Sequence, residues 1–120
     1  DLAGHACIVY SSVQGDARWL FHAPGGTEES VPVRGPLRSN NLSTVLAACE
    51  AGLGLAVLPR YVARGALAAG RLTVLLPDCP LPVQELHAVF SSPKLVPQKV
   101  RGFIDWLQLQ LHGDWWDRAP

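Results

Sequence analysis

Hydrophobic and polar positions change their spacing several times along the chain, and each change predicts a different element. Residues 5–10 (HACIVY) form a short apolar run with β-branched side chains, which is typical of a strand buried on both faces. Residues 18–23 and 30–34 alternate around a Pro-Gly-Gly break and predict a hairpin. Pro32 restricts the second strand to an edge or an irregular course, because proline has no amide hydrogen to donate.

A helical period starts at residue 41 and predicts a helix with one buried face. Ser39, Asn40 or Asn41 can cap its start, and Gly52 can adopt the left-handed conformation that ends it. Residues 53–58 then predict a short strand closed by a proline, and Gly54 is expected to let helix and strand approach closely. The apolar positions that follow the i, i+3, i+4, i+7 spacing are Leu42, Val45, Leu46 and Cys49.

The second half of the sequence continues this alternation. Residues 60–69 predict a short helix ended by Gly70, and residues 72–76 and 85–90 predict strands. A last helix carries one apolar stripe, formed by Val100, Phe103, Ile104, Leu107 and Leu111. Strands that mainly alternate with helices predict an α/β fold with a mixed, mainly parallel sheet flanked by helices.

Composition narrows the class of protein. The 120 residues contain 48% hydrophobic and 17% charged residues, which excludes a disordered chain. Ten basic residues balance ten acidic ones, so nothing indicates that this chain itself binds nucleic acid or a membrane. Three cysteines do not match a disulfide framework and favour a reducing cytoplasm. The absence of methionine suggests that the sequence begins inside a longer protein.

Several residues carry reactive side chains that could form a site. His5 and Cys7 share a strand face, but no second pair completes a metal site, and we expect neither a metal nor a cofactor. Ser11 and Ser12 follow a strand without the G-x-S-x-G pattern of a hydrolase, so turn or cap serines are favoured over an enzyme. The glycines of the A-x-x-x-G-x-G pattern follow a helix and precede a strand, the reverse of a phosphate-binding loop.

The start of the helix near residue 41 carries more information. Free amides of its first turn, beside Ser39, Asn40 and Asn41, form a cluster of donors that suits a carboxylate or another polar group. Simple capping is the alternative. Trp19 and Phe21 are more typical of a core than of a ligand-stacking surface, and Trp106 lies off the apolar stripe of the last helix.

The segment AACEAGLGLAVLP closely resembles the effector-binding domain of LysR-type bacterial transcription regulators. The segments DLAGHACIVY, RWLFHA, VPVRGPLRSNN, GALAAGRLTVLLPD, ELHAVFSS and KVRGFIDWL stand in the order of that family. The resemblance implies a fold similar to periplasmic (type 2) solute-binding proteins: two α/β lobes with a small effector in the cleft between them. It implies further that residues 1–82 are the second lobe, residues 83–112 a crossing strand and helix that return to an incomplete first lobe, and residues 113–120 a tail.

The resemblance also implies a site and partners. Tyr10, Ser11 and Ser12 would face the cleft together with Ser39, Asn40 and Asn41. The partners would be an effector, DNA contacted only through a helix-turn-helix domain absent from this chain, and other copies in a homo-oligomer. A solute-binding lobe of a transport system is the alternative, and it would need an export signal or a lipid anchor.

Overall fold

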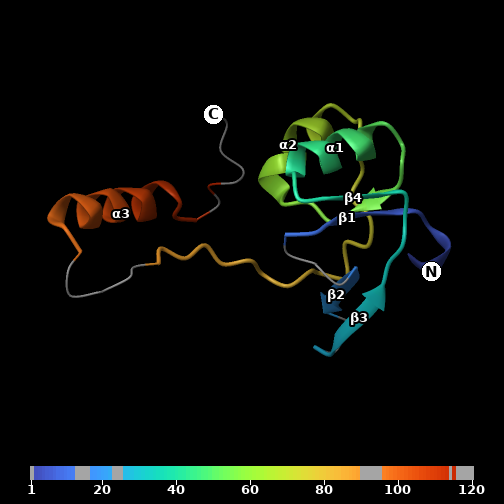
Figure 1. Cartoon of the computed structure of the whole chain (residues 1–120), viewed down its shortest axis with the longest axis horizontal. Helices are drawn as coiled ribbons and strands as arrows, with labels where there is room; N and C mark the ends of the chain where they lie inside the picture. The colour runs from blue at the N-terminus through green and yellow to red at the C-terminus, as the bar shows by residue number, and fades with distance from the viewer. Residues whose placement is uncertain (1, 13–16, 23–25, 90–95, 114, 116–120) are drawn as a thin grey trace. The chain divides into compact units, whose positions relative to one another are not determined.

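The computed structural model separates the chain into two units, Asp1–Pro82 and Val83–Pro120, which Figure 1 shows in one colour ramp. It describes residues 2–12, 17–22, 26–89, 96–113 and 115. The first unit opens with a short 3-10 helix, η1 (Leu2–Gly4). Each unit is described by itself below.

Strand β1 (Cys7–Tyr10) lies at the centre of a three-stranded parallel sheet with the order β4-β1-β5. Strand β4 (Leu37–Ser39) pairs with β1 from Ile8 to Tyr10, and β5 (Leu55–Ala56) pairs with its first two residues. The parallel pairing predicted from the alternation of elements is therefore confirmed. Strand β4 was not predicted, because it is short and carries only one apolar side chain.

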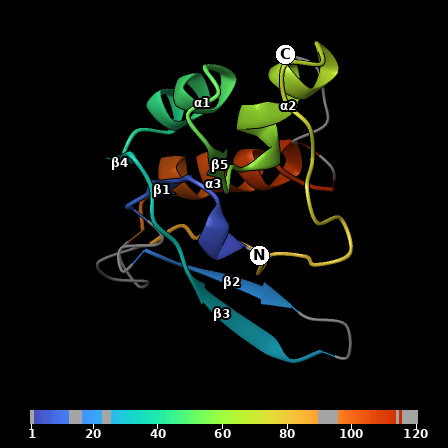
Figure 2. The same ribbon diagram turned by 90° about the vertical axis from the view of Figure 1, so that its right-hand side faces the viewer.

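Both faces of β1 are covered, as the apolar run at residues 5–10 predicted. Ile8 packs on one face against Val45 and Ala48 of helix α1 (Leu42–Glu50). Cys7 and Val9 pack on the other face against Trp19 and Val33, and Trp19 is only 3% exposed. Figure 2 shows α1 and helix α2 (Arg60–Ala68) on one side of the sheet, with strands β2 and β3 on the other.

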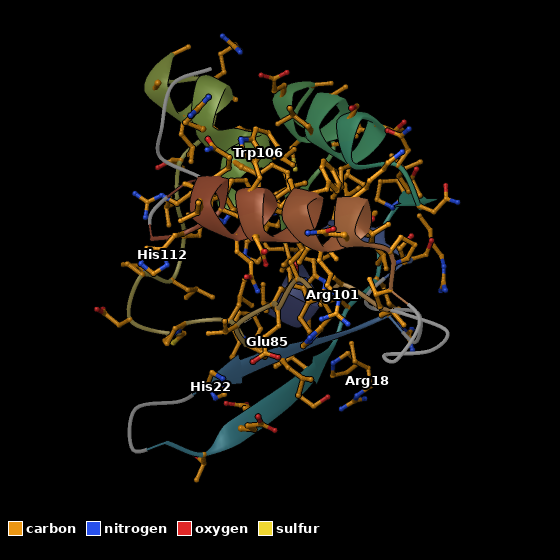
Figure 3. The ribbon with its side chains drawn as sticks, turned by 90° about the vertical axis from the view of Figure 1, so that its left-hand side faces the viewer. Arg18, His22, Glu85, Arg101, Trp106 and His112 are labelled. Carbon is orange, nitrogen blue, oxygen red and sulfur yellow. The ribbon has the colours of Figure 1, made fainter. Side chains whose placement is uncertain are left out.

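The hairpin predicted from the second apolar segment is present. Strand β2 (Arg18–His22) pairs antiparallel with β3 (Glu28–Pro32), and together they form a separate two-stranded sheet. Arg18 and His22 stand at opposite ends of β2 (Figure 3). Trp19 and Phe21 point from β2 toward the core, as the sequence favoured, because the strand alternates its side chains between two faces.

Glycines end both helices of the first unit in the left-handed conformation. Gly52 has φ +76° after α1, and Gly70 has φ +68° after α2. In each case the next amide reaches back to a carbonyl of the last turn: Leu53 N donates to Ala48 O at 3.0 Å, and Arg71 N to Ala66 O at 2.9 Å. Gly52 N also donates to Cys49 O at 2.9 Å, and Gly70 N to Leu67 O at 3.0 Å, so each helix has both bonds of a Schellman end. Both predicted helix ends are therefore confirmed.

Two predicted strands are wrong. Residues 72–76 form no ladder: Leu72 N donates to Ala66 O at the end of α2, and Leu76 takes φ +54° before a proline. Residues 83–89 are exposed and carry no strand, because no neighbouring strand among the described residues pairs with them. The last residue of the predicted strand, Phe90, lies outside the described residues.

The second unit contains helix α3 (Gln98–Gln110), as the apolar stripe predicted. None of its residues is buried. Along the described part of the chain, no helix has the length and apolar character required to span a membrane.

Candidate functional site

The candidate site lies where β1 and β4 end. Because these strands are parallel and adjacent, their carboxyl ends meet at one edge of the sheet. Tyr10 is the register partner of Ser39, and Ser11 N donates a hydrogen bond to Ser39 O at 2.9 Å. The structure thus brings together the two segments that contain all the candidate residues, residues 10–12 and 39–41.

Side-chain oxygens shape the turn that leads from β4 into α1. Ser39 Oγ accepts a hydrogen bond from Asn41 N at 3.1 Å. Asn41 has an extended backbone and is the N-cap: its Oδ1 accepts a hydrogen bond from Thr44 N at 3.1 Å. Of the three capping candidates, Asn41 therefore caps the helix. Ser39 holds Asn41 in place by accepting the hydrogen bond from its amide.

Two backbone donors of α1 remain open after this capping. The Thr44 amide is satisfied by Asn41, whereas Leu42 and Ser43 have no acceptor for their amides within the described segments. These two amides carry the partial positive charge of the helix N-terminus. The sequence predicted free amides in the first turn of this helix, and the bonds at its N-terminus assign them to Leu42 and Ser43.

The remaining candidate residues differ in exposure. Tyr10 is partly buried because its ring packs beside the cluster of Ile8, Val45 and Ala48, while Ser12 and Asn40 are exposed. Every candidate side chain is neutral. The site therefore offers hydroxyl, amide and backbone donors beside a weakly positive helix end, an arrangement that favours a carboxylate or another electron-rich group.

A second helix starts at the same edge of the sheet. Strand β5 runs parallel to β1, and α2 begins at Arg60, four residues after β5 ends at Ala56. Pro59 stands at the N-cap position of α2 and provides no side-chain cap. The alternation of strand and helix in the sequence predicts that α2 starts at this edge, because helices that follow parallel strands begin at the same edge of the sheet.

The two residues predicted to share a strand face, His5 and Cys7, differ in burial. Cys7 is fully buried under the sheet, whereas His5 is exposed before the strand begins. Burial raises the pKa of the Cys7 thiol, and a hydrogen bond from the Arg34 backbone opposes part of that shift. Among the residues that are described, no three metal-binding side chains of the His, Cys, Asp or Glu type cluster.

Comparison with known proteins places this geometry in a family. The family model for the LysR substrate binding domain matches residues 1–111. The chain belongs to the LysR substrate-binding domain family. This LysR domain is 34% identical over 110 residues to the probable HTH-type transcriptional regulator LtrA of Klebsiella pneumoniae, covering 89% of the chain and 35% of that protein. It is 32% identical over 111 residues to the HTH-type transcriptional regulator PtxR of Pseudomonas aeruginosa, covering 92% of the chain and 35% of that protein.

A solved structure carries the same fold. The regulatory domain of AphB in Vibrio vulnificus matches 91% of the LysR domain described here and 53% of its own chain, with a TM-score of 0.66 and 27% sequence identity. The chain therefore spans about a third of the length of the curated relatives it matches, since it covers 35% of each of the two named above. The matched family is one of transcriptional regulators and not of enzymes.

Proposed function

We propose that residues 1–82 are the second lobe of the effector-binding domain of a LysR-type transcriptional regulator in the bacterial cytoplasm. In this proposal a small molecule binds at the carboxyl edge of the β4-β1-β5 sheet, between this lobe and a first lobe that lies outside this sequence. Residues 83–112 supply the crossing segment and a helix that return to the first lobe, and residues 113–120 form a tail. DNA is contacted by a helix-turn-helix domain elsewhere in the parent protein.

One observation carries the proposal. The pairing of Tyr10 and Ser11 with Ser39 puts the open first turn of α1 at the carboxyl edge of a parallel sheet. Ligands of open α/β sheets bind outside this edge, where loops and helix N-termini meet. Membership of a regulator family favours a sensory role over the alternative role in transport.

Regulation requires that the effector bind two arrangements of the parent protein with different affinity. A tenfold difference in affinity shifts the equilibrium between the two arrangements by about 1.4 kcal/mol. The two open amides, of Leu42 and Ser43, are fixed by the helix and the Asn41 cap. A polar effector group therefore meets donors that need no reorganisation, and closure of the opposite lobe supplies the difference in affinity.

The test uses the longer parent regulator with its operator DNA. Candidate metabolites are titrated, and DNA binding is measured by fluorescence anisotropy. An Asn41→Asp variant keeps a good helix cap but adds a negative charge beside the open amides, so we expect an effector with a carboxylate to bind at least about tenfold more weakly. An Asn41→Ser variant keeps the cap without the charge and should respond like the wild-type protein.

A matched charge control distinguishes the site from a general effect. Thr73→Asp adds the same charge on the exposed segment after α2 and should leave the response unchanged. The sensory proposal fails if no metabolite changes operator binding. The location of the site is wrong if an effector is found and its affinity is equal for the wild-type, Asn41→Asp and Thr73→Asp proteins.

A further inference from the structure

The hairpin sheet has an outer edge along β3, where no other strand among the described residues pairs with it. In an antiparallel pair, the backbone groups of successive residues point alternately toward the neighbouring strand and away from it. Val33 N donates to Ala17 O at 2.9 Å, so every second residue counted back from Val33 faces β2. The backbone groups of Glu28, Ser30 and Pro32 therefore point outward, where an added strand would bond.

The outer edge of β2 confirms this alternation. His22 is the register partner of Glu28, and its amide points away from β3, donating to Pro80 O at 2.8 Å. Proline has no amide hydrogen, so neither Pro80 nor Pro82 returns a bond that would extend this contact into a ladder. A short proline-rich segment thus covers the His22 end of the β2 edge.

At the edge of β3, the side chain of Arg18 holds the central outward residue. Arg18 Nε donates to Ser30 Oγ at 2.8 Å, and Arg18 Nη2 donates to Ser30 O, also at 2.8 Å. Both nitrogens belong to one planar guanidinium, so a single rigid fork binds the side chain and the carbonyl of the same residue. A strand arriving at this edge needs that carbonyl as an acceptor and meets a cation beside it.

The next outward position lacks a donor. Pro32 lies two residues beyond Ser30 and has no amide hydrogen, while its place at the end of β3 costs no bond to β2. Glu28, the remaining outward position, is exposed and adds a negative charge. Prolines and charged side chains are among the means by which natural sheets prevent the pairing of their edges.

The chain itself contains segments that an open edge would bind. Residues 72–76 and 83–89 have the composition of strands and no ladder. Their side chains are exposed: Val74 by 65%, Leu86 by 80% and Val89 by 89%. Extended apolar segments without a partner add readily to an unprotected strand, so the state of the β3 edge matters for this chain.

We propose that Arg18 and Pro32 close the outer edge of β3 against the addition of a strand. Arg18 does so by holding the carbonyl of Ser30, and Pro32 by withholding an amide hydrogen. The hairpin then presents its outer face to solvent without becoming a template for extended segments of other chains. This inference uses only the bonds of the hairpin and does not depend on the proposed function.

The test removes the fork and measures self-association of the whole chain by sedimentation velocity. Arg18→Met keeps the length of the side chain and removes its donors, and we expect the association constant to rise at least about tenfold. Arg34→Met, at an exposed position outside the hairpin, makes the same change in charge and side chain and serves as the matched control. Hydrogen exchange should show the amide of Ser30 becoming more protected with protein concentration in Arg18→Met only.

A rescue variant distinguishes edge closure from a general loss of stability. Because the amide of Ser30 points outward, Ser30→Pro breaks no bond to β2 and closes the edge by a different means. The double variant Arg18→Met/Ser30→Pro should therefore associate no more than the wild-type protein, and circular dichroism verifies its fold. Association that persists in the double variant, or that is equal in Arg18→Met and Arg34→Met, overturns the proposal.

A second route opens the same edge without changing Arg18. Pro32→Thr supplies an outward amide hydrogen, and we expect it to raise the association constant at least about threefold. If Arg18→Met does not fold, Pro32→Thr decides the question, and unchanged association in this variant contradicts the proposal. No effector or DNA is present in these experiments, so their failure leaves the effector-site proposal standing.

Discussion

Alanine substitutions at three glycines of the first unit distinguish two costs. One is the cost of a backbone conformation that alanine disfavours, and the other is the cost of steric overlap by the added Cβ. Gly52 has φ +76°, and a Cβ added there meets nothing within 4 Å. Gly35 lacks a positive φ, but a Cβ there would overlap the backbone of Cys7. Gly54 has both features, with φ +154° and a Cβ that would overlap the Ala6 carbonyl group.

The magnitudes follow from these differences. Alanine at Gly52 takes a left-handed conformation without a clash, which costs about 1–2 kcal/mol. Alanine at Gly54 takes a conformation that is nearly restricted to glycine and also pushes against backbone that cannot rotate away, so we expect about 3 kcal/mol or more. The bond from Leu55 N to Ala6 O at 2.9 Å, which ties β5 to the start of β1, is then lost or lengthened.

Urea unfolding of the whole chain, followed by far-ultraviolet circular dichroism, measures these costs. We expect Gly54→Ala and Gly35→Ala to lower the free energy of unfolding more than Gly52→Ala does. If Gly54→Ala costs no more than Gly52→Ala, the close approach of the helix-to-strand turn to Ala6 does not stabilise the fold, and the reasoning fails.

Three further predictions concern the same unit. Asn41→Ala removes the acceptor for Thr44 N and should lower the free energy of unfolding by about 1 kcal/mol, whereas Asn41→Asp should change it by only about 0.3 kcal/mol; equal losses in urea melts would exclude the cap. Val45→Ala, at a fully buried position, should cost about 2 kcal/mol by the same measurement, and a loss below about 0.5 kcal/mol would contradict its place in the core. Burial raises the pKa of the Cys49 thiol above its ordinary value of 9.0, so its contribution to stability is complete below that pH and is lost as the pH rises through the folded-state pKa. Stability should therefore fall as the pH rises above 9.0, and Cys49→Ala should flatten this decline; an unchanged slope would refute the assignment.

The sequence predicted the elements whose signals are local. The apolar spacing after residue 41 and the left-handed glycine at Gly52 specified α1 almost to the residue, because cap, period and stop signal agree there. The buried run at residues 5–10 similarly predicted β1, although the strand itself begins at Cys7. Each of these signals acts within about one turn of helix or one short strand.

The sequence failed where a strand depends on a partner. Leu37 begins a strand only because β1 lies beside it, and its own neighbours give no alternation to read. Residues 72–76 and 85–89 have the composition of strands and lack a ladder, since composition measures fit to a half-buried surface and supplies no neighbour. Pairing is a property of the assembled fold, so sequence spacing alone does not determine it.

The candidate site was also predicted from local signals, whereas its assembly depends on strand pairing. The sequence indicated one group of side chains after a strand, at residues 10–12, and another before a helix, at residues 39–41. The pairing of Tyr10 with Ser39 brings these two segments together. The sequence also predicted free amides in the first turn of the helix. Their assignment to Leu42 and Ser43 depends on which residue caps the helix, and the bond from Thr44 N to Asn41 Oδ1 decides this.

The pattern that identifies the family and the atoms that would bind an effector lie at opposite ends of α1. Ala48, Gly52 and Gly54 form the A-x-x-x-G-x-G signature: Ala48 is 8% exposed against the sheet, and the glycines make the tight turn into β5. These residues specify packing and offer a ligand no functional group. The signature therefore requires the same scaffold for every effector, while the residues around Asn41 remain free to vary with the ligand. Substitutions at the glycines should accordingly destabilise the fold whatever the effector, and substitutions at the start of α1 should change affinity in a folded lobe.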